Sequence, residues 1–129
     1  MLGIDTSCDD TSCGIVENGR KVLSNVVSSQ TELHSKYGGV VPEIASRSHV
    51  EAMIPVTNEA LSLSGKTLDE IQAVAVTGGP GLLGSLLVGV AFAKSLAYAR
   101  KVPLINVHHL AGHIYANFLG DSEPEFPVL

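Results

Sequence analysis

Residues 2–27, LGIDTSCDDTSCGIVENGRKVLSNVV, decide the fold of this chain. The short apolar run Leu2–Asp5 predicts a strand, and a polar turn follows it. Ser12–Glu17 predicts a second strand, which leads into Asn18-Gly19, the strongest short hairpin signal. Lys21–Val27 then returns as a third strand. The first part of the chain therefore predicts three antiparallel strands.

Beyond these strands the sequence alternates between helical and strand patterns. Ser28–Ser48 shows no clear period and contains Gly38-Gly39, so we expect a loop there. An apolar stripe predicts a helix over His49–Leu63, which Pro55 kinks or splits. The elements expected after it are a turn at Asp69–Ile71, a strand over Ala73–Thr77, a helix over Leu82–Tyr98, a strand over Pro103–Val107 and a helix over His109–Phe118.

The order βββ-α-β-α-β-α predicts an α/β fold, one lobe of an actin-like (ribonuclease-H-like) two-lobed ATPase fold with a mixed sheet and crossover helices. A chain of 129 residues is large enough for one domain with its own core. We place this lobe at residues 1–122. Residues 123–129 are expected to form a linker and the start of a second lobe, because Phe126–Leu129 resembles the beginning of another strand. Folds of this kind usually hold a nucleotide between two such lobes.

The composition is that of a soluble globular protein, with 45% hydrophobic and 16% charged residues. No apolar run is long enough to span a bilayer, and the first residues do not form a signal peptide. Cys8 and Cys13 are too few for a disulfide framework, which favours the reducing cytoplasm. The net charge is −5 and the eight basic residues are scattered, so contacts to nucleic-acid phosphates are expected to come mainly from another lobe or a partner.

The turn after the first predicted strand packs hydroxyl groups and two adjacent carboxylates, Asp9 and Asp10, into a few residues. Hydroxyls and backbone amides of such a turn can hold phosphate oxygens, and a carboxylate can bind a cation or orient a nucleophile. The alternative is a turn whose Asp and Ser side chains bond their own backbone. Both interpretations remain open on the residues alone.

The glycine-rich segment Thr77-Gly78-Gly79-Pro80-Gly81 joins a predicted buried strand to a predicted helix. Amides at a helix start can meet an anion. The segment is not a Walker A motif, because no lysine precedes Ser85, and it is not the dinucleotide fingerprint. The alternative is a turn that lets the helix pack tightly on the sheet.

His109 and His113 lie four residues apart in a predicted helix, so both imidazoles can face one metal ion. Gly112 leaves open space beside them. The pair is not the zincin motif, which requires Glu directly after the first histidine, where this chain has Leu110. Two ligands rarely complete a site, so we expect half of a metal centre.

The polar segment Pro42–His49 allows two interpretations. Ser46 or Ser48 could cap the start of the following helix. Alternatively, Glu43 and Arg47 could form part of a surface for a substrate or a partner.

Four motifs together resemble the tRNA threonylcarbamoyladenosine transferase family, formerly labelled O-sialoglycoprotein endopeptidase or glycoprotease. They occur in the family's order along residues 2–129. The matching segments are Gly3-Ile4-Asp5-Thr6-Ser7-Cys8-Asp9-Asp10-Thr11, Tyr37-Gly38-Gly39-Val40-Val41-Pro42-Glu43-Ile44-Ala45-Ser46-Arg47, Gly79-Pro80-Gly81-Leu82 and His109-Leu110-Ala111-Gly112-His113.

The resemblance implies a two-lobed enzyme that transfers a threonylcarbamoyl group from threonylcarbamoyl-adenylate to N6 of the adenosine beside the tRNA anticodon. It implies one bound metal, iron or zinc, held by His109, His113 and an aspartate of a C-terminal lobe. It also places the loop with Ser7, Asp9 and Asp10 at the active-site cleft, which makes Asp9 and Asp10 the catalytic candidates and Ser7 a substrate-binding candidate. The implied partners are a non-catalytic paralogue and a small ATPase.

Because the chain ends where the second lobe of the family should begin, we expect the N-terminal lobe alone to be inactive, and its uncovered interlobe face to favour self-association. A non-catalytic scaffold like the paralogue is the alternative, although that paralogue lacks the paired histidines. A metallopeptidase lacks its glutamate here, and a sugar or acetate kinase would have no role for the histidine pair.

Overall fold

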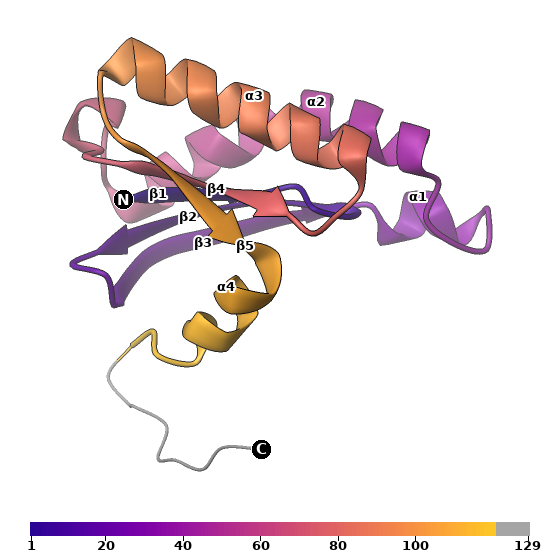
Figure 1. Ribbon diagram of the computed structural model, residues 1–129, viewed down its shortest axis with the longest axis horizontal. Coiled ribbons are helices and arrows are strands. Elements are labelled where there is room, and N and C mark those ends of the chain that lie inside the picture. Colours follow the sequence, from indigo (N-terminus) through magenta and orange to yellow (C-terminus); the bar gives the residue numbers. More distant parts are fainter. Residues whose placement is uncertain (121–129) are drawn as a thin grey trace.

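The computed structural model describes residues 1–120 of the chain. It contains five strands, four α-helices and one short 3-10 helix within those residues (Figure 1). The strands are β1 Leu2–Asp5, β2 Asp10–Glu17, β3 Lys21–Ser29, β4 Val74–Gly79 and β5 Leu104–His108. The helices are α1 Thr31–Ser35, α2 Pro42–Ser64, η1 Leu68–Glu70, α3 Leu83–Arg100 and α4 His109–Ala116.

The strands form one mixed sheet in the order β3-β2-β1-β4-β5. β1, β2 and β3 are antiparallel, and Glu17 lies opposite Lys21 across the predicted hairpin. β4 pairs with β1, and β5 with β4, in parallel. The carboxyl ends of β1, β4 and β5 therefore meet at one edge of the sheet, where the first residue of β2 also lies. This arrangement confirms the predicted α/β lobe of the actin-like fold.

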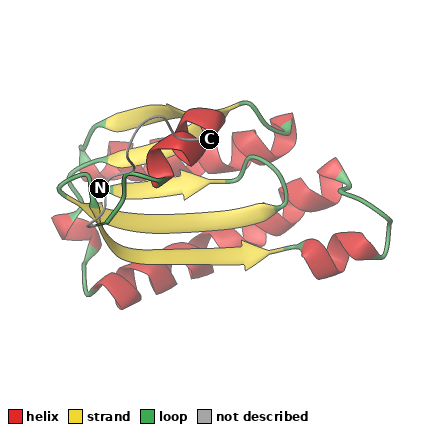
Figure 2. Ribbon diagram, turned by 90° about the horizontal axis from the view of Figure 1, so that it is seen from below, coloured by secondary structure: helices red, strands yellow, loops and turns green. Residues whose placement is uncertain are grey.

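Helices α2 and α3 cover one face of the sheet, and α4 lies on the other (Figures 1 and 2). The core between the sheet and the two long helices comes from alternate strand positions and one stripe of each helix. Its largest members are aliphatic, among them Leu2, Ile15, Met53, Val56 and Val74. Burial of this surface is the main stabilising term for the lobe.

The loop predicted over Ser28–Ser48 is wrong for most of its length. β3 continues to Ser29, α1 follows, and α2 begins at Pro42 rather than at His49. Apolar periodicity misses this first part of α2 because its residues are mostly small or polar, and Pro42 starts the helix from a position where no backbone N–H is needed.

The predicted serine caps of α2 are also wrong. Ser46 lies inside the helix, and its hydroxyl donates to the carbonyl oxygen of Pro42 at 2.8 Å. The N-cap residue is Val41, which makes no side-chain capping bond. Pro55 does not split the helix, which runs unbroken from residue 42 to residue 64. The fixed φ of proline is compatible with a helix, so tertiary packing of the buried stripe can hold a helix through one lost hydrogen bond.

The polar turn after β1 is shorter than expected, because Asp10 and Thr11 already belong to β2. The other predicted helices and strands are confirmed within a few residues at their ends. The predicted strand and linker after Asp121, and the boundary between residues 122 and 123, lie outside the described residues. No helix in residues 1–120 is both long enough and apolar enough to cross a membrane.

Candidate metal and carboxylate site

The predicted histidine pair lies in the first two turns of α4, where β5 ends at the carboxyl edge of the sheet. The Nε2 atoms of His109 and His113 are 3.1 Å apart, and their rings meet edge to face. Two imidazoles bound to one tetrahedral ion at about 2.0–2.1 Å place their nitrogens about 3.3 Å apart. The pair is therefore spaced as two ligands of a single metal ion would be.

Asp5, at the end of β1, fixes the ring of His109. Its Oδ2 atom lies 3.0 Å from His109 Nδ1 and also accepts the hydroxyl of Thr77 at 2.7 Å. Because an ionised carboxylate can only accept, Nδ1 carries the proton, and the lone pair of His109 is left on Nε2, toward His113. A carboxylate behind a histidine in this way orients the ring and raises its basicity as a metal ligand.

The carboxyl group of Asp5 is kept ionised by its neighbours. Burial by itself would raise its pKa, but hydrogen bonds from Ser7, Thr77 and His109 outweigh burial and hold the pKa below the usual value. The backbone N–H of Ser7 donates to the other oxygen, Oδ1, at 2.7 Å. Sequence analysis did not select Asp5 as a site residue. Its position at the carboxyl end of a predicted strand was the signal that could have found it, because ligands bind where parallel strands end together.

Ser7 is almost fully buried, with 5% of its surface exposed. Its hydroxyl lies 3.2 Å from His109 Nδ1, and its carbonyl oxygen accepts the N–H of Leu82 at 2.8 Å. The glycine-rich segment approaches here because a side chain at Gly81 would collide with the Ser7 backbone. The turn after β1, the glycine segment and α4 are thus joined at one residue.

A cleft of about 340 Å³ contains the predicted site residues together. It is lined by Asp5, Ser7, Cys8, Asp9, Asp10, Ser12, Val27, His109 and His113. A second hollow of about 270 Å³ shares Ser7, Cys8 and His109 with it and extends over Pro80–Leu82. The structure therefore places Asp9, Asp10, Ser7 and the histidine pair around a common space. Glu43 and Arg47 are not part of it, since they form an exposed ion pair with each other on α2 at 2.8 Å.

The residues present fit a metal ion in part. Two imidazole nitrogens, one of them oriented by a carboxylate, suit zinc or iron. Within residues 1–120, however, no group of three or more His, Cys, Asp or Glu side chains is arranged to hold a metal. Whether the histidine pair holds half of a metal centre stays a prediction.

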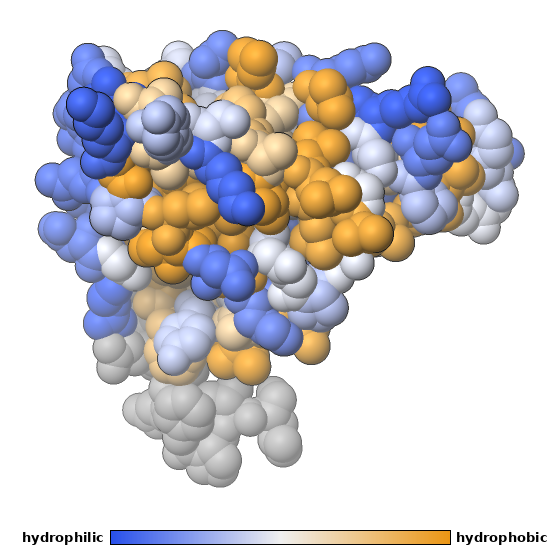
Figure 3. All heavy atoms as spheres, turned by 45° about the horizontal axis from the view of Figure 1, so that its top comes forward, coloured by the Kyte–Doolittle hydropathy of each residue, from blue (hydrophilic) through white to orange (hydrophobic). Residues whose placement is uncertain are grey.

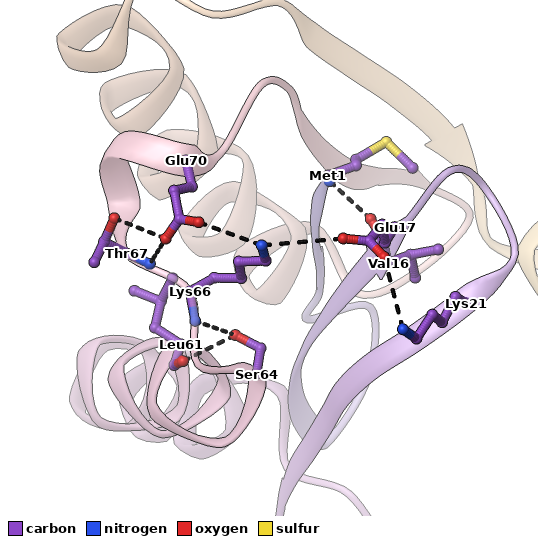
Figure 4. Close-up of polar contacts among 9 residues, drawn as sticks. All are labelled: Met1, Val16, Glu17, Lys21, Leu61, Ser64, Lys66, Thr67 and Glu70. Atoms are coloured by element: carbon purple, nitrogen blue, oxygen red, sulfur yellow. Dashed lines mark hydrogen bonds and ion pairs between the residues drawn. The ribbon is translucent and has the colours of Figure 1, made fainter.

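Another hollow, of about 380 Å³, lies at the opposite end of the sheet. Its charged groups pair with one another: the amino group of Lys66 lies 3.3 Å from Glu70 and 4.0 Å from Glu17 (Figure 4). The Met1 amino group donates to Val16 O at 2.8 Å. These contacts join the α2–η1 turn to the start of β1 and the end of β2.

Comparison with known proteins agrees with the fold. A crystal structure from Pseudomonas aeruginosa, described as an uncharacterized protein with similarity to peptidase YEAZ, superposes with a TM-score of 0.65. The superposition covers 89% of this chain and 47% of that chain, at 24% sequence identity, and therefore bears on the fold alone.

Sequence relatives are much closer. The protein named tRNA N6-adenosine threonylcarbamoyltransferase from Symbiobacterium thermophilum is 60% identical over 129 residues, and the one from Syntrophus aciditrophicus is 58% identical. Both matches cover 100% of this chain and 38% of the relative, so the chain spans less than two fifths of these proteins.

A family model, described as tRNA N6-adenosine threonylcarbamoyltransferase, matches residues 21–129. This match takes in most of the chain, including β4, the glycine-rich segment and the histidine pair. The chain belongs to the tRNA N6-adenosine threonylcarbamoyltransferase family.

Proposed function

We propose that this chain supplies the histidine half-site and the carboxylate loop of a metal-dependent transferase that moves a threonylcarbamoyl group from threonylcarbamoyl-adenylate to N6 of an adenosine beside the tRNA anticodon. The observation that carries the proposal is the series Asp5–His109–His113, which opens into the cleft that Asp9 and Asp10 also line. The resemblance and the names of the relatives supply the reaction.

In this reaction the N6 amine attacks the carbamoyl carbonyl carbon, the bond to the adenylate oxygen breaks, and the amine loses one proton. An iron or zinc ion bound at the site would supply Lewis acidity toward the carbonyl or the leaving phosphate. Asp9 and Asp10 are the proposed acceptors of the amine proton, or the groups that orient the amine. Ser7 is the proposed substrate contact, since it lines both adjoining hollows.

Asp5 and Thr77 are proposed as positioning residues. They hold His109 with its Nδ1 proton fixed and its Nε2 lone pair toward His113. Fixing a ligand before substrate arrives removes the need to order it during the reaction, which is how positioning lowers a barrier.

The partners are proposed from the same family. They are tRNA, the adenylate, a non-catalytic paralogue and a small ATPase, all in the cytoplasm. We propose that the chain by itself is inactive, because the third metal ligand implied by the family is an aspartate of a C-terminal lobe and the described residues offer two ligands.

The test is a chimera in which this chain replaces the 129 matching residues of the Symbiobacterium thermophilum relative. Purified chimera, its partners, adenylate and tRNA are assayed for formation of the modified adenosine. His109→Ala and Asp9→Ala should each abolish transfer. His108→Ala is the matched control, because that neighbouring histidine is exposed and absent from the cleft. An active His109→Ala chimera contradicts the proposed role of the histidine pair, and an unaltered chimera that forms no modified adenosine favours the scaffold alternative.

A further inference from the structure

A third histidine, His49 of α2, is fully buried and takes no part in the proposed chemistry. Its two ring nitrogens reach two residues of the β1–β2 region. Nε2 lies 3.0 Å from the backbone oxygen of Cys8, and Nδ1 lies 2.7 Å from the hydroxyl of Thr11. These two residues stand on either side of Asp9 and Asp10. His49 thus holds both ends of the segment that carries the candidate catalytic carboxylates.

The chemistry of the two partners fixes the proton on His49. A backbone oxygen can only accept, so Nε2 must be the donor to Cys8. In the neutral ring Nδ1 is then an acceptor, and the Thr11 hydroxyl donates to it. Thr11 is itself fully buried, so neither the ring nor this partner is exposed to solvent. Both nitrogens are used once and both partners are satisfied, as a buried polar group requires.

The first half of this turn is held by different elements. Thr6 and Ser7 are held by α3 and the glycine segment, through the bonds Thr6 Oγ1 to Ser85 O at 2.7 Å and Leu82 N to Ser7 O at 2.8 Å. Those bonds fix the first half of the turn. In the second half, Asp9 is partly exposed and Asp10 exposed, and Asp10 and Thr11 pair with β3. His49 supplies the hydrogen bonds that join this half to the helical layer.

We propose that His49, in its Nε2-protonated neutral form, is a positioning residue that sets where Asp9 and Asp10 stand in the cleft. The catalytic consequence rests on the proposed function; the structural one does not. Loss of the bond to Cys8 should loosen the turn at Cys8 and Asp9 while the core stays folded, because Asp10 and Thr11 remain paired with β3.

Two substitutions separate the two bonds. The amide of His49→Gln places an N–H near the position of Nε2 and can still donate to Cys8, whereas the amide of His49→Asn reaches only as far as Nδ1. His34 provides the control. It is also buried, at 3% exposure, and also uses both nitrogens, with Gln30 Oε1 at 3.0 Å and the Val41 N–H at 3.3 Å. It holds the segment before α2 rather than the carboxylate turn.

The experiment is hydrogen–deuterium exchange on the chain, read on peptides covering residues 6–12 and normalised to global stability measured by urea unfolding. His49→Asn should speed exchange there at least tenfold, His49→Gln should restore most of the protection, and His34→Asn should leave this peptide unchanged. Unchanged exchange in His49→Asn, or equal acceleration in His34→Asn, overturns the proposal.

Two further measurements test the proposal, one of the His49 tautomer and one of the kinetics of the chimera. If His49→Asn does not fold, the tautomer of His49 in the unaltered chain is measured by nitrogen–proton correlation NMR, and an Nδ1-protonated ring overturns the assignment. In the active chimera, His49→Asn should lower kcat with little change in KM for tRNA, and His49→Gln should rescue it. An inactive chimera with the expected exchange pattern removes the proposed function and leaves the positioning role standing.

Discussion

Among the side chains at the carboxyl ends of β1, β4 and β5, the carboxylate of Asp5 makes several hydrogen bonds. It is bonded to Ser7, Thr77 and His109 at once, so it links three separate segments. In the proposed function, Asp5 would orient the metal ligand His109 without itself binding the metal. Its contribution can be measured on the chain without any transfer assay.

Asp5→Asn should weaken zinc binding by the chain about 10–100-fold, because the amide holds the His109 ring less firmly and carries no charge. The measurement is an anaerobic competition titration against a chromogenic chelator. Asp69→Asn is the control, since Asp69 pairs with Arg100 at 2.6 Å outside the cleft. Equal zinc affinity in Asp5→Asn and the unaltered chain would remove Asp5 from the site.

The reactivity of the Cys8 thiol, and how it changes with pH, gives a test of the same turn. Burial, followed by the hydrogen bond and charge of Asp9, raises the pKa of this thiol. The thiolate is the reactive form, so a raised pKa means slow alkylation near neutral pH and faster alkylation as the pH rises. Asp9→Asn removes the neighbouring charge and should lower that pKa.

We therefore expect iodoacetamide to label Cys8 several-fold faster in Asp9→Asn than in the unaltered chain at pH 7.5, with the difference vanishing at high pH. Cys13 is the internal control, because burial raises its pKa to about 11 and only 1% of its surface is exposed. Labelling is followed by mass spectrometry. Identical pH profiles for Cys8 in both proteins would contradict this account.

At the scale of elements, close packing of α3 on the turn after β1 depends on Gly89. A Cβ there would collide with the side chain of Thr6, which is fully buried and bonded to Ser85. Alanine is favoured over glycine in a helix by about 1 kcal/mol, but overpacking costs about 1–3 kcal/mol. Gly89→Ala should therefore lower the free energy of unfolding by roughly 1–2 kcal/mol.

Gly112 in α4 is the matched comparison for Gly89. Its Cβ would meet only Val107 Cγ1, at an ordinary 3.9 Å. Gly112→Ala should raise the free energy of unfolding by about 0.5–1 kcal/mol through helix propensity. Both are measured by urea unfolding, and a stabilised Gly89→Ala would show that α3 is not in close contact with the turn.

Helix α2 contains an internal proline, which gives a second test at this scale. Pro55 is exposed, so its replacement changes no core contact. Pro55→Ala restores a backbone N–H in a continuous helix and should stabilise the chain by up to about 3 kcal/mol. The urea midpoint measures it. No gain in stability would mean that the helix is interrupted at this point.

The whole molecule exposes apolar side chains on two faces. Figure 3 shows such side chains over α2 and α3, where Val50, Ile54, Leu83 and Leu87 are exposed. On the opposite side of the sheet, α4 exposes Leu110, Ile114 and Tyr115 beside the cleft. We propose that the second of these faces, which adjoins the cleft, is the interlobe surface.

We expect the chain to self-associate through the α4 face in sedimentation velocity at high concentration. Ile114→Glu should shift the population toward monomer, because a charge there would be buried on association. Leu87→Glu, on the α2–α3 face, is the control and should leave association unchanged. If Leu87→Glu alone produced monomer, the contact would lie on the helical face, and a purely monomeric chain would contradict the prediction altogether.

The sequence by itself determined the elements that depend on local patterning. The hairpin at Asn18-Gly19, the apolar helix α3 and the histidine pair at spacing four follow from neighbours a few residues apart. The α2 start and the short α1 did not follow, because residues 28–48 lack an apolar period and their helices are held by packing. The four sequence motifs were also sufficient to predict the tRNA threonylcarbamoyladenosine transferase family.

Tertiary structure alone decided which of these residues share a site. Asp5 and His109 are 104 positions apart in the chain, and Thr77 stands 72 positions after Asp5. Parallel pairing of β1 with β4 and of β4 with β5 brings them to hydrogen-bonding distance. The same holds for His49, which meets Cys8 only because α2 packs on the sheet. Periodicity in a sequence records which face of an element is apolar, and it contains no measure of which strand ends will lie side by side.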